Sequence, residues 1–190
     1  FLTLNLKKRY DLSCIVRKSS KIKLINYSNH YFHDELTDDQ VLIKILSRYD
    51  ILINCYGYAH SSVKSKKDLS ELIKSNIYFC KRLFKLSAIS KIKKVIHLSS
   101  IKAMGENGYF DISMNAKPTS FYGRSKLISE KILINNFKKQ NSKKTYHIIR
   151  LPLVFGNNKP RGYLKIIDYY LKLKLPFPIF KNSKYRSYIS

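Results

Sequence analysis

The 190-residue sequence has little cysteine, little acid and no long apolar run. No apolar stretch approaches the roughly 20 residues that cross a bilayer, so no membrane span is expected. The chain turns basic within its first seven residues, which argues against a signal peptide. The three cysteines have no short spacing, so no disulfide framework and no metal site is predicted. Cys14 and Cys55 lie in apolar runs typical of buried free thiols, and we therefore expect a cytoplasmic protein.

Acidic residues are few: 12 Asp and Glu stand against 37 Lys and Arg, which gives a net charge of +25 and a pI of about 10.0. Such an excess suggests nucleic acid or an anionic membrane as a partner. The basic residues are mostly Lys, however, and they occur in every segment. The chain is also rich in Ile, Asn and Tyr, which A+T-rich codons supply together with Lys. We favour genome composition as the source of the charge and expect no specific nucleic-acid partner and no membrane.

A glycine-rich turn is absent, because no G-x-G-x-x-G or G-x-x-G-x-x-G occurs anywhere. A nucleotide-binding α/β domain normally opens with a strand and such a turn, which cradles the pyrophosphate. Residues 1–10 instead indicate the helix that would follow the turn. We interpret the chain as lacking the first strand and its turn, and as a piece of a longer protein.

Short apolar runs alternate with amphipathic stretches, which indicates an α/β fold with a mostly parallel sheet. In the helix expected at 37–48, Thr37 is the predicted N-cap, with Gln40 three residues later. The predicted strands are 12–16, 51–55, 94–99, 145–150 and the start of one at 185–190; the predicted helices are 37–48, 68–88, 121–137 and 162–174; the predicted loops are 101–119 and 151–160.

Several stretches, read in order, resemble the extended short-chain dehydrogenase/reductase family and its NAD-dependent epimerase/dehydratase branch. They are YDLSCIVRK, DELTDDQVLIKIL, YDILINCYGYAH, KKVIHLSSIKAMGE, FYGRSKLISEKIL, RLPLVFG and KYRSYIS, and they cover nearly the whole chain. The ordered set is specific, although Y-x-x-x-K alone is common by chance. The resemblance implies a Rossmann-like doubly wound parallel sheet, with a partial NAD(P)-binding domain over 1–160 and the start of the substrate-binding region over 161–190.

The resemblance assigns a catalytic centre to Ser100, Tyr122 and Lys126. Tyr122 would act as general acid/base, Lys126 would bind the nicotinamide ribose and lower the Tyr122 pKa, and Ser100 would hold the reacting sugar oxygen. The residue types suit this chemistry, because a phenol with a pKa of about 10 is a poor base unless a nearby ammonium favours the phenolate. Tyr122 and Lys126 are four apart on a predicted helix, so they share a face.

The cofactor implied by the resemblance is NAD or NADP. The basic end of the strand at Arg17 suits a 2′-phosphate and favours NADP. Arg186 would contact the nucleotide diphosphate, because a guanidinium fork suits that task. His60, His97 and Asn76 are interpreted as structural. The remaining residues implied to line the cofactor are Glu35, Leu36, Cys55, Tyr56, Gly57, Ser99, Pro152 and Val154, and Lys102 is implied to contact the substrate.

The implied activity is 4-epimerisation or 4-keto reduction of a UDP-hexose or UDP-N-acetylhexosamine, in surface-polysaccharide synthesis. The two reactions are not separated by the sequence. A dehydratase is disfavoured, because Ile101 and Lys102 stand where those relatives carry an Asp-Glu pair. The full-length protein is expected to form a homodimer through the helices 68–88 and 121–137. The competing hypothesis is a non-catalytic or decayed Rossmann-like module that binds RNA or another anion.

Overall fold

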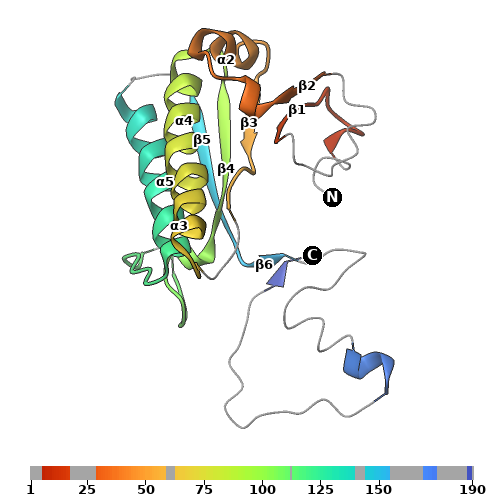
Figure 1. Ribbon diagram of the computed structural model, residues 1–190, viewed down its shortest axis with the longest axis vertical. Helices are drawn as coiled ribbons and strands as arrows, with labels where there is room; N and C mark the ends of the chain where they lie inside the picture. Colours follow the sequence, from red (N-terminus) through yellow and green to blue (C-terminus); the bar gives the residue numbers. More distant parts are fainter. Residues whose placement is uncertain are drawn as a thin grey trace.

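The computed structural model describes residues 6–17, 29–58, 63–111, 113–139, 144–154, 169–174 and 188–189. It confirms the predicted α/β fold with parallel strands, and helices pack against the sheet (Figure 1). None of the helices in this described part of the chain combines the length and apolar character that a membrane crossing requires.

The main sheet has three parallel strands in the order β3 (Ile51–Asn54), β4 (Lys94–Ser100) and β5 (Thr145–Leu151). The register pairs Ile51 with Lys94 and Lys94 with Thr145, so the carboxyl ends of the three strands meet at one edge. In open α/β sheets this edge is where nucleotides bind. The topology therefore directs the search for a functional site to the residues that follow these strands.

A second, two-stranded parallel sheet joins β1 (Ser13–Val16) to β2 (Asn29–Phe32). The sequence did not predict β2, because its polar first half, Asn29 and His30, carries no strand signal. Within the described residues no strand pairs with β3 on the side away from β4, and β1 lies beside this edge (Figure 1). The Tyr49 hydroxyl bridges the two sheets by donating to Ser13 Oγ at 2.6 Å. Among the described residues no strand lies between β1 and β3, where a Rossmann-like sheet has its first strand.

The long helix expected at 68–88 is confirmed, with a departure in its middle. It consists of α3 (Lys66–Ile73), a π-helical segment (Lys74–Tyr78) and α4 (Phe79–Ile89). It begins before residue 68 because Ser65 and Asp68 form a capping box, each accepting a backbone N–H of the other.

Two further helices, α2 and α5, pack against α4. The helix α2 (Asp39–Leu46) begins later than predicted, and Thr37 was the wrong N-cap. Asp38 caps the helix instead, because its carboxylate accepts the Gln40 N–H at 2.7 Å. The helix α5 (Phe121–Lys139) matches the expected 121–137.

The C-terminal region is described only in part. Residues 169–172 are helical, inside the expected helix at 162–174, and β7 (Tyr188–Ile189) pairs in parallel with β6 (Leu153–Val154). The strand β6 falls where the sequence predicted a loop. At the other end, residues 6–10 form a helical turn, with the Tyr10 N–H bonded to the Leu6 carbonyl at 3.0 Å. The division into two domains at residue 160 stays a prediction.

The core lies between the sheet and the helices α2, α4 and α5. Several of its apolar residues are exposed by 1% or less, among them Leu42, Phe84, Val95 and Leu133. Burying such a side chain contributes about 1.5–3 kcal/mol. The expectation of buried thiols is wrong for Cys55, which is exposed because it follows β3 at the open edge of the sheet.

Candidate active site

Three consecutive residues at the end of β4 contact three residues of α5. The Lys126 ammonium donates to the Leu98 carbonyl at 3.1 Å, and the Ser99 hydroxyl donates to Glu130 at 2.5 Å. The Ser100 side chain lies near enough to Tyr122 to lower the pKa of its phenol. These contacts join the strand to the helix, and the structure brings the predicted Ser100, Tyr122 and Lys126 to the same end of β4.

Tyr122 lies in the first turn of α5 and is half-buried. Burial raises the pKa of its phenol above the ordinary value, and the nearby Ser100 side chain opposes that rise. Gly123 permits this placement, since a Cβ at that position would collide with the Lys102 carbonyl oxygen. The phenol is accordingly protonated at neutral pH in this structure.

Lys126 is 7% exposed, and burial lowers the pKa of its ammonium. Gly57, in the turn after β3, packs directly against it: a Cβ added to Gly57 would lie 2.9 Å from Asn76 Oδ1 and 3.3 Å from Lys126 Nζ. Cys55, in the same turn, interacts electrostatically with Lys126. The turn predicted to contact the cofactor therefore adjoins the predicted catalytic lysine.

The same turn carries an aromatic cluster. The Tyr56 ring lies 4.3 Å from the Phe79 ring and 5.1 Å from the His33 ring, measured between centroids. The Arg17 guanidinium sits 4.8 Å above the Tyr56 ring and donates to the Gly57 carbonyl at 3.3 Å. Cation–π and hydrogen-bond contacts thus hold Arg17 at the edge where the adenosine half of a dinucleotide would lie.

The amide of Asn76 joins this turn to α5. It accepts from the Tyr58 N–H at 2.7 Å, donates to the Tyr58 carbonyl at 3.2 Å and donates to Ser125 Oγ at 2.9 Å. The Ser125 hydroxyl in turn donates to the Tyr122 carbonyl at 2.8 Å. Asn76 lies in the π-helical segment, a feature often found at functional sites.

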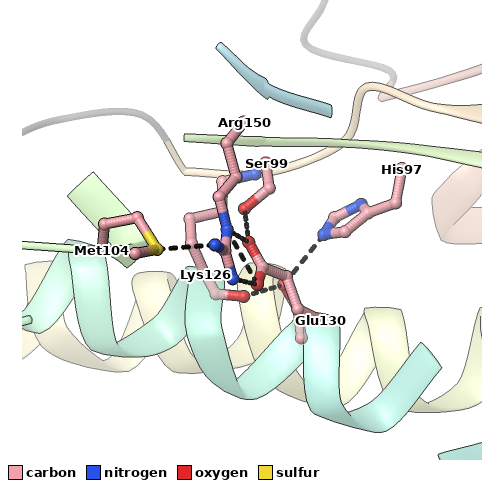
Figure 2. Close-up of polar contacts among 7 residues, drawn as sticks. His97, Ser99, Met104, Lys126, Glu130 and Arg150 are labelled. Atoms are coloured by element: carbon pink, nitrogen blue, oxygen red, sulfur yellow. Dashed lines mark hydrogen bonds and ion pairs between the residues drawn. The ribbon is translucent and has the colours of Figure 1, made fainter. Parts of the chain in front are cut away.

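Next to Lys126 lies a largely buried polar layer that sequence reasoning missed (Figure 2). Glu130, 2% exposed, accepts from Arg150 Nη2 at 2.6 Å and from Arg150 Nε at 3.0 Å. A further Arg150 N–H points at the Met104 sulfur. The i, i+4 spacing of Lys126 and Glu130 was the available signal, since it places both on one helix face.

His97 belongs to the same layer and makes two side-chain contacts. Its Nδ1 lies 3.2 Å from Asn54 Nδ2, and its Nε2 lies 2.9 Å from Ser129 Oγ, which donates to the Lys126 carbonyl at 2.7 Å. Burial lowers the His97 pKa to about 3, so the ring is neutral at pH 7. No group of three or more His, Cys, Asp or Glu able to hold a metal occurs among the described residues.

The other predicted site residues are placed as follows. Glu35 is exposed at the end of a 3-10 turn, whereas the Leu36 side chain is buried in the core. Lys102 pairs with Glu106 at 3.5 Å, beside Ser100, whose Oγ accepts the Lys102 N–H. Pro152 and Val154 follow β5, with Val154 48% exposed. Arg186 and His60 lie outside the described residues.

The fold is that of a Rossmann-like α/β domain. A model of the NAD dependent epimerase/dehydratase family matches residues 2–184, and the chain belongs to that family. A search of curated proteins finds no match.

Solved structures share the fold. UDP-glucose 4-epimerase from Thermotoga maritima, bound to UDP-glucose, is 21% identical with a TM-score of 0.74, over 99% of this chain and 64% of its own. UDP-glucuronic acid 4-epimerase from Bacillus cereus, bound to UDP-glucuronic acid and NAD, is 23% identical with a TM-score of 0.61, over 80% and 49%. MoeE5, bound to UDP-glucuronic acid and NAD, is 15% identical with a TM-score of 0.70, over 89% and 56%. The chain thus spans between about half and two thirds of the length of these relatives.

A dinucleotide fits part of this edge. Lys126 offers a buried ammonium, and Tyr122, one turn earlier on α5, offers a half-buried phenol. These groups suit a ribose and a reacting hydroxyl, and Arg17 offers a guanidinium at the end of β1. The glycine-rich turn that would cradle the pyrophosphate is not in the 190-residue sequence. The residues present therefore fit the nicotinamide end and one side of the adenosine end.

Proposed function

We propose that the protein is an NAD(P)-dependent sugar-nucleotide epimerase or reductase that acts at C4 of a UDP-hexose or UDP-N-acetylhexosamine. The observation that carries this proposal is the placement of Ser100 beside Tyr122, with Lys126 one turn further along α5, at the carboxyl edge of a parallel sheet. The family and the sugar nucleotides bound to the structural relatives support the substrate class.

The chain's own residues would manage the proton and the position of the sugar. Ser100 would hold the C4 oxygen, and Tyr122 would take the hydroxyl proton as the C4–H bond breaks. NAD(P), when bound, supplies the hydride acceptor. Lys126 would hold the nicotinamide ribose and favour the phenolate of Tyr122, against the burial that raises the Tyr122 pKa.

The choice between NAD and NADP rests on Arg17. Two of the relatives described above were crystallised with NAD, whereas the basic end of β1 suits a 2′-phosphate. In the structure the Arg17 guanidinium already bonds to Gly57 and covers Tyr56. We propose NAD or NADP as cofactor, and the ratio of the two KM values decides between them.

The cellular setting is also a proposal. We place the enzyme in the cytoplasm, in surface-polysaccharide synthesis, as a homodimer that forms through the outer faces of the long helices. Exposed apolar side chains on those faces support the dimer: Tyr78 is 64% exposed, Ile89 50% and Ile128 41%.

The test is replacement of Tyr122 by Phe in the protein expressed from the full gene. Loss of the phenol removes the proton acceptor, so we expect turnover of UDP-sugars to fall by about 10²–10⁴-fold. Cofactor binding, measured by calorimetry, should change little because the ring remains. Product analysis by NMR with UDP-sugars and with their 4-keto forms separates epimerase from reductase.

A control variant is Tyr109→Phe, on a residue that is 83% exposed. It should retain full turnover. Two results together would instead support the non-catalytic hypothesis: the wild type turns over no UDP-sugar, and the wild type and Tyr122→Phe bind RNA equally well.

A further inference from the structure

Glu130 is a buried acid for which the proposed chemistry has no role. It lies one turn after Lys126 on α5 and is 2% exposed. Removing a carboxylate from water costs several kcal/mol, which an ion pair offsets only with good geometry. Arg150 supplies that geometry by donating through both Nε and Nη2, and Ser99 donates a third hydrogen bond. A buried apolar pair would serve stability as well, so the retained charges invite a functional explanation.

The Glu130–Arg150 pair lies next to the contacts that hold Lys126 and Tyr122 against β4. Ser99 stands between Leu98, whose carbonyl accepts from Lys126, and Ser100, which lies beside Tyr122. The Ser99–Glu130 bond therefore holds β4 to α5 one residue away from the Leu98 carbonyl that accepts from Lys126 (Figure 2). A shift of α5 along β4 that moved Lys126 would have to break it.

The ionisable groups around Lys126 also point to Glu130. These groups come from several elements: Cys55 after β3, Cys80 on α4, His97 on β4, Arg150 on β5 beyond Glu130, and Glu130 on α5 itself. Desolvation raises the pKa values of both thiols, and the His97 pKa is about 3, so these groups are neutral at pH 7. Burial lowers the Lys126 pKa, and Glu130 opposes that change.

We propose that the Glu130–Arg150 pair, anchored by Ser99, is a positioning device that keeps the Lys126 ammonium charged and in line with Tyr122. The Glu130 carboxylate favours the Lys126 ammonium. Arg150 weakens this attraction by binding the same carboxylate, and it prevents a direct Lys126–Glu130 bond that would draw Lys126 away from the cofactor. The catalytic meaning of this inference rests on the proposed function, but the effect on Lys126 does not.

A charge series tests the inference in the protein from the full gene. Glu130→Gln leaves Arg150 as a local positive charge, Arg150→Gln leaves Glu130 as a local negative charge, and the double variant is neutral as the wild type is. The readout is the NMR titration of the lysine ¹³Cε signals, with Lys126 assigned by its loss in Lys126→Arg. We expect the Lys126 pKa to fall by about one pH unit in Glu130→Gln, to rise in Arg150→Gln and to return toward wild type in the double variant.

The control is Asp50→Asn, which removes an exposed ion pair with Lys93 and should leave the Lys126 titration unchanged. If the Glu130–Arg150 pair has only a structural role, both single variants lose stability while the Lys126 pKa stays constant. This result would overturn the inference. If Arg150→Gln does not fold, the difference between Glu130→Gln and the double variant decides the same question.

Activity then separates the two proposals. The basic limb of the kcat profile should move with the Lys126 pKa in each folded variant. Wild-type protein without turnover would contradict the proposed function, while the ordered titration of Lys126 would still support the inference.

Discussion

At the scale of the residue, His97 shows how burial selects one chemical form. Asn54 Nδ2 can only donate, so His97 Nδ1 accepts and the proton resides on Nε2, which donates to Ser129 Oγ. The Ser129 hydroxyl in turn donates a hydrogen bond to the Lys126 carbonyl. This chain of directed bonds needs a neutral imidazole, because a protonated Nδ1 would face the Asn54 N–H₂. The sequence-based interpretation of His97 as structural agrees with these contacts.

His97 predicts a pH dependence of stability. Its folded pKa of about 3 lies below the ordinary 6.5, so the unfolded state binds the extra proton between these values. The stabilisation is therefore complete above pH 6.5 and is lost as the pH falls toward 3, at up to about 1.4 kcal/mol per pH unit. Urea unfolding of wild type should show a loss of about 3 kcal/mol from this group between pH 7 and pH 4.

The comparison is His97→Gln, whose amide keeps a donor and an acceptor but does not titrate. Its unfolding free energy should depend less steeply on pH over the same interval. Equal slopes for the two proteins would show that His97 does not titrate in this window.

At the scale of the element, the long helix α3–α4 depends on its π-helical segment. The wider turn directs Ser75 and Asn76 inward, where both are buried. From there Asn76 reaches both the backbone of Tyr58 and the side chain of Ser125. One amide thus connects the turn after β3 to the first turns of α5.

Asn76→Ala should cost about 2–3 kcal/mol of unfolding free energy, because it leaves the Tyr58 N–H and the Ser125 hydroxyl without this partner. Chemical denaturation measures the loss. The matched control is Asn136→Ala on α5, where a single bond to the Ile132 carbonyl one turn back is removed and alanine favours the helix. Equal destabilisation by the two variants would contradict the role assigned to the inward amide.

At the scale of the molecule, two short sheets share one core although no backbone pairing joins them within the described residues. Within the described residues β1 and β3 do not pair with each other, so each presents unpaired backbone groups. Side chains of both sheets, among them Ile15 and Leu52, nevertheless pack on the same apolar cluster. Such unpaired strands are sites of edge-to-edge association.

We expect the isolated 190-residue chain to aggregate and to bind NAD(P) weakly, because of these strand edges and the missing glycine-rich turn. Light scattering and calorimetry with NAD(P) measure the two properties. The protein from the full gene is the control and should be soluble and bind the cofactor. A monomeric 190-residue chain with tight NAD(P) binding would refute this prediction.

The sequence alone determined the class of fold and led to the predicted site residues Ser100, Tyr122 and Lys126. Buried parallel strands are continuous apolar runs, so ILIN and KVIHLS were recognisable without knowledge of their neighbours. Tyr122 and Lys126 lie four residues apart in one helix, so their spacing could be read from the sequence. The motifs around them predicted a family, and the match to that family's model confirms it.

Only the tertiary structure decided how the trio is supported. The strand β2 is stabilised by pairing with β1 rather than by its own composition, which is why its polar residues predicted nothing. Ser99, Glu130 and Arg150 come from a strand, a helix and the next strand, with 20 residues or more between successive partners. A contact at such a separation depends on the register of β4 with β5 and on the placement of α5, and neither is encoded in any local pattern of residues.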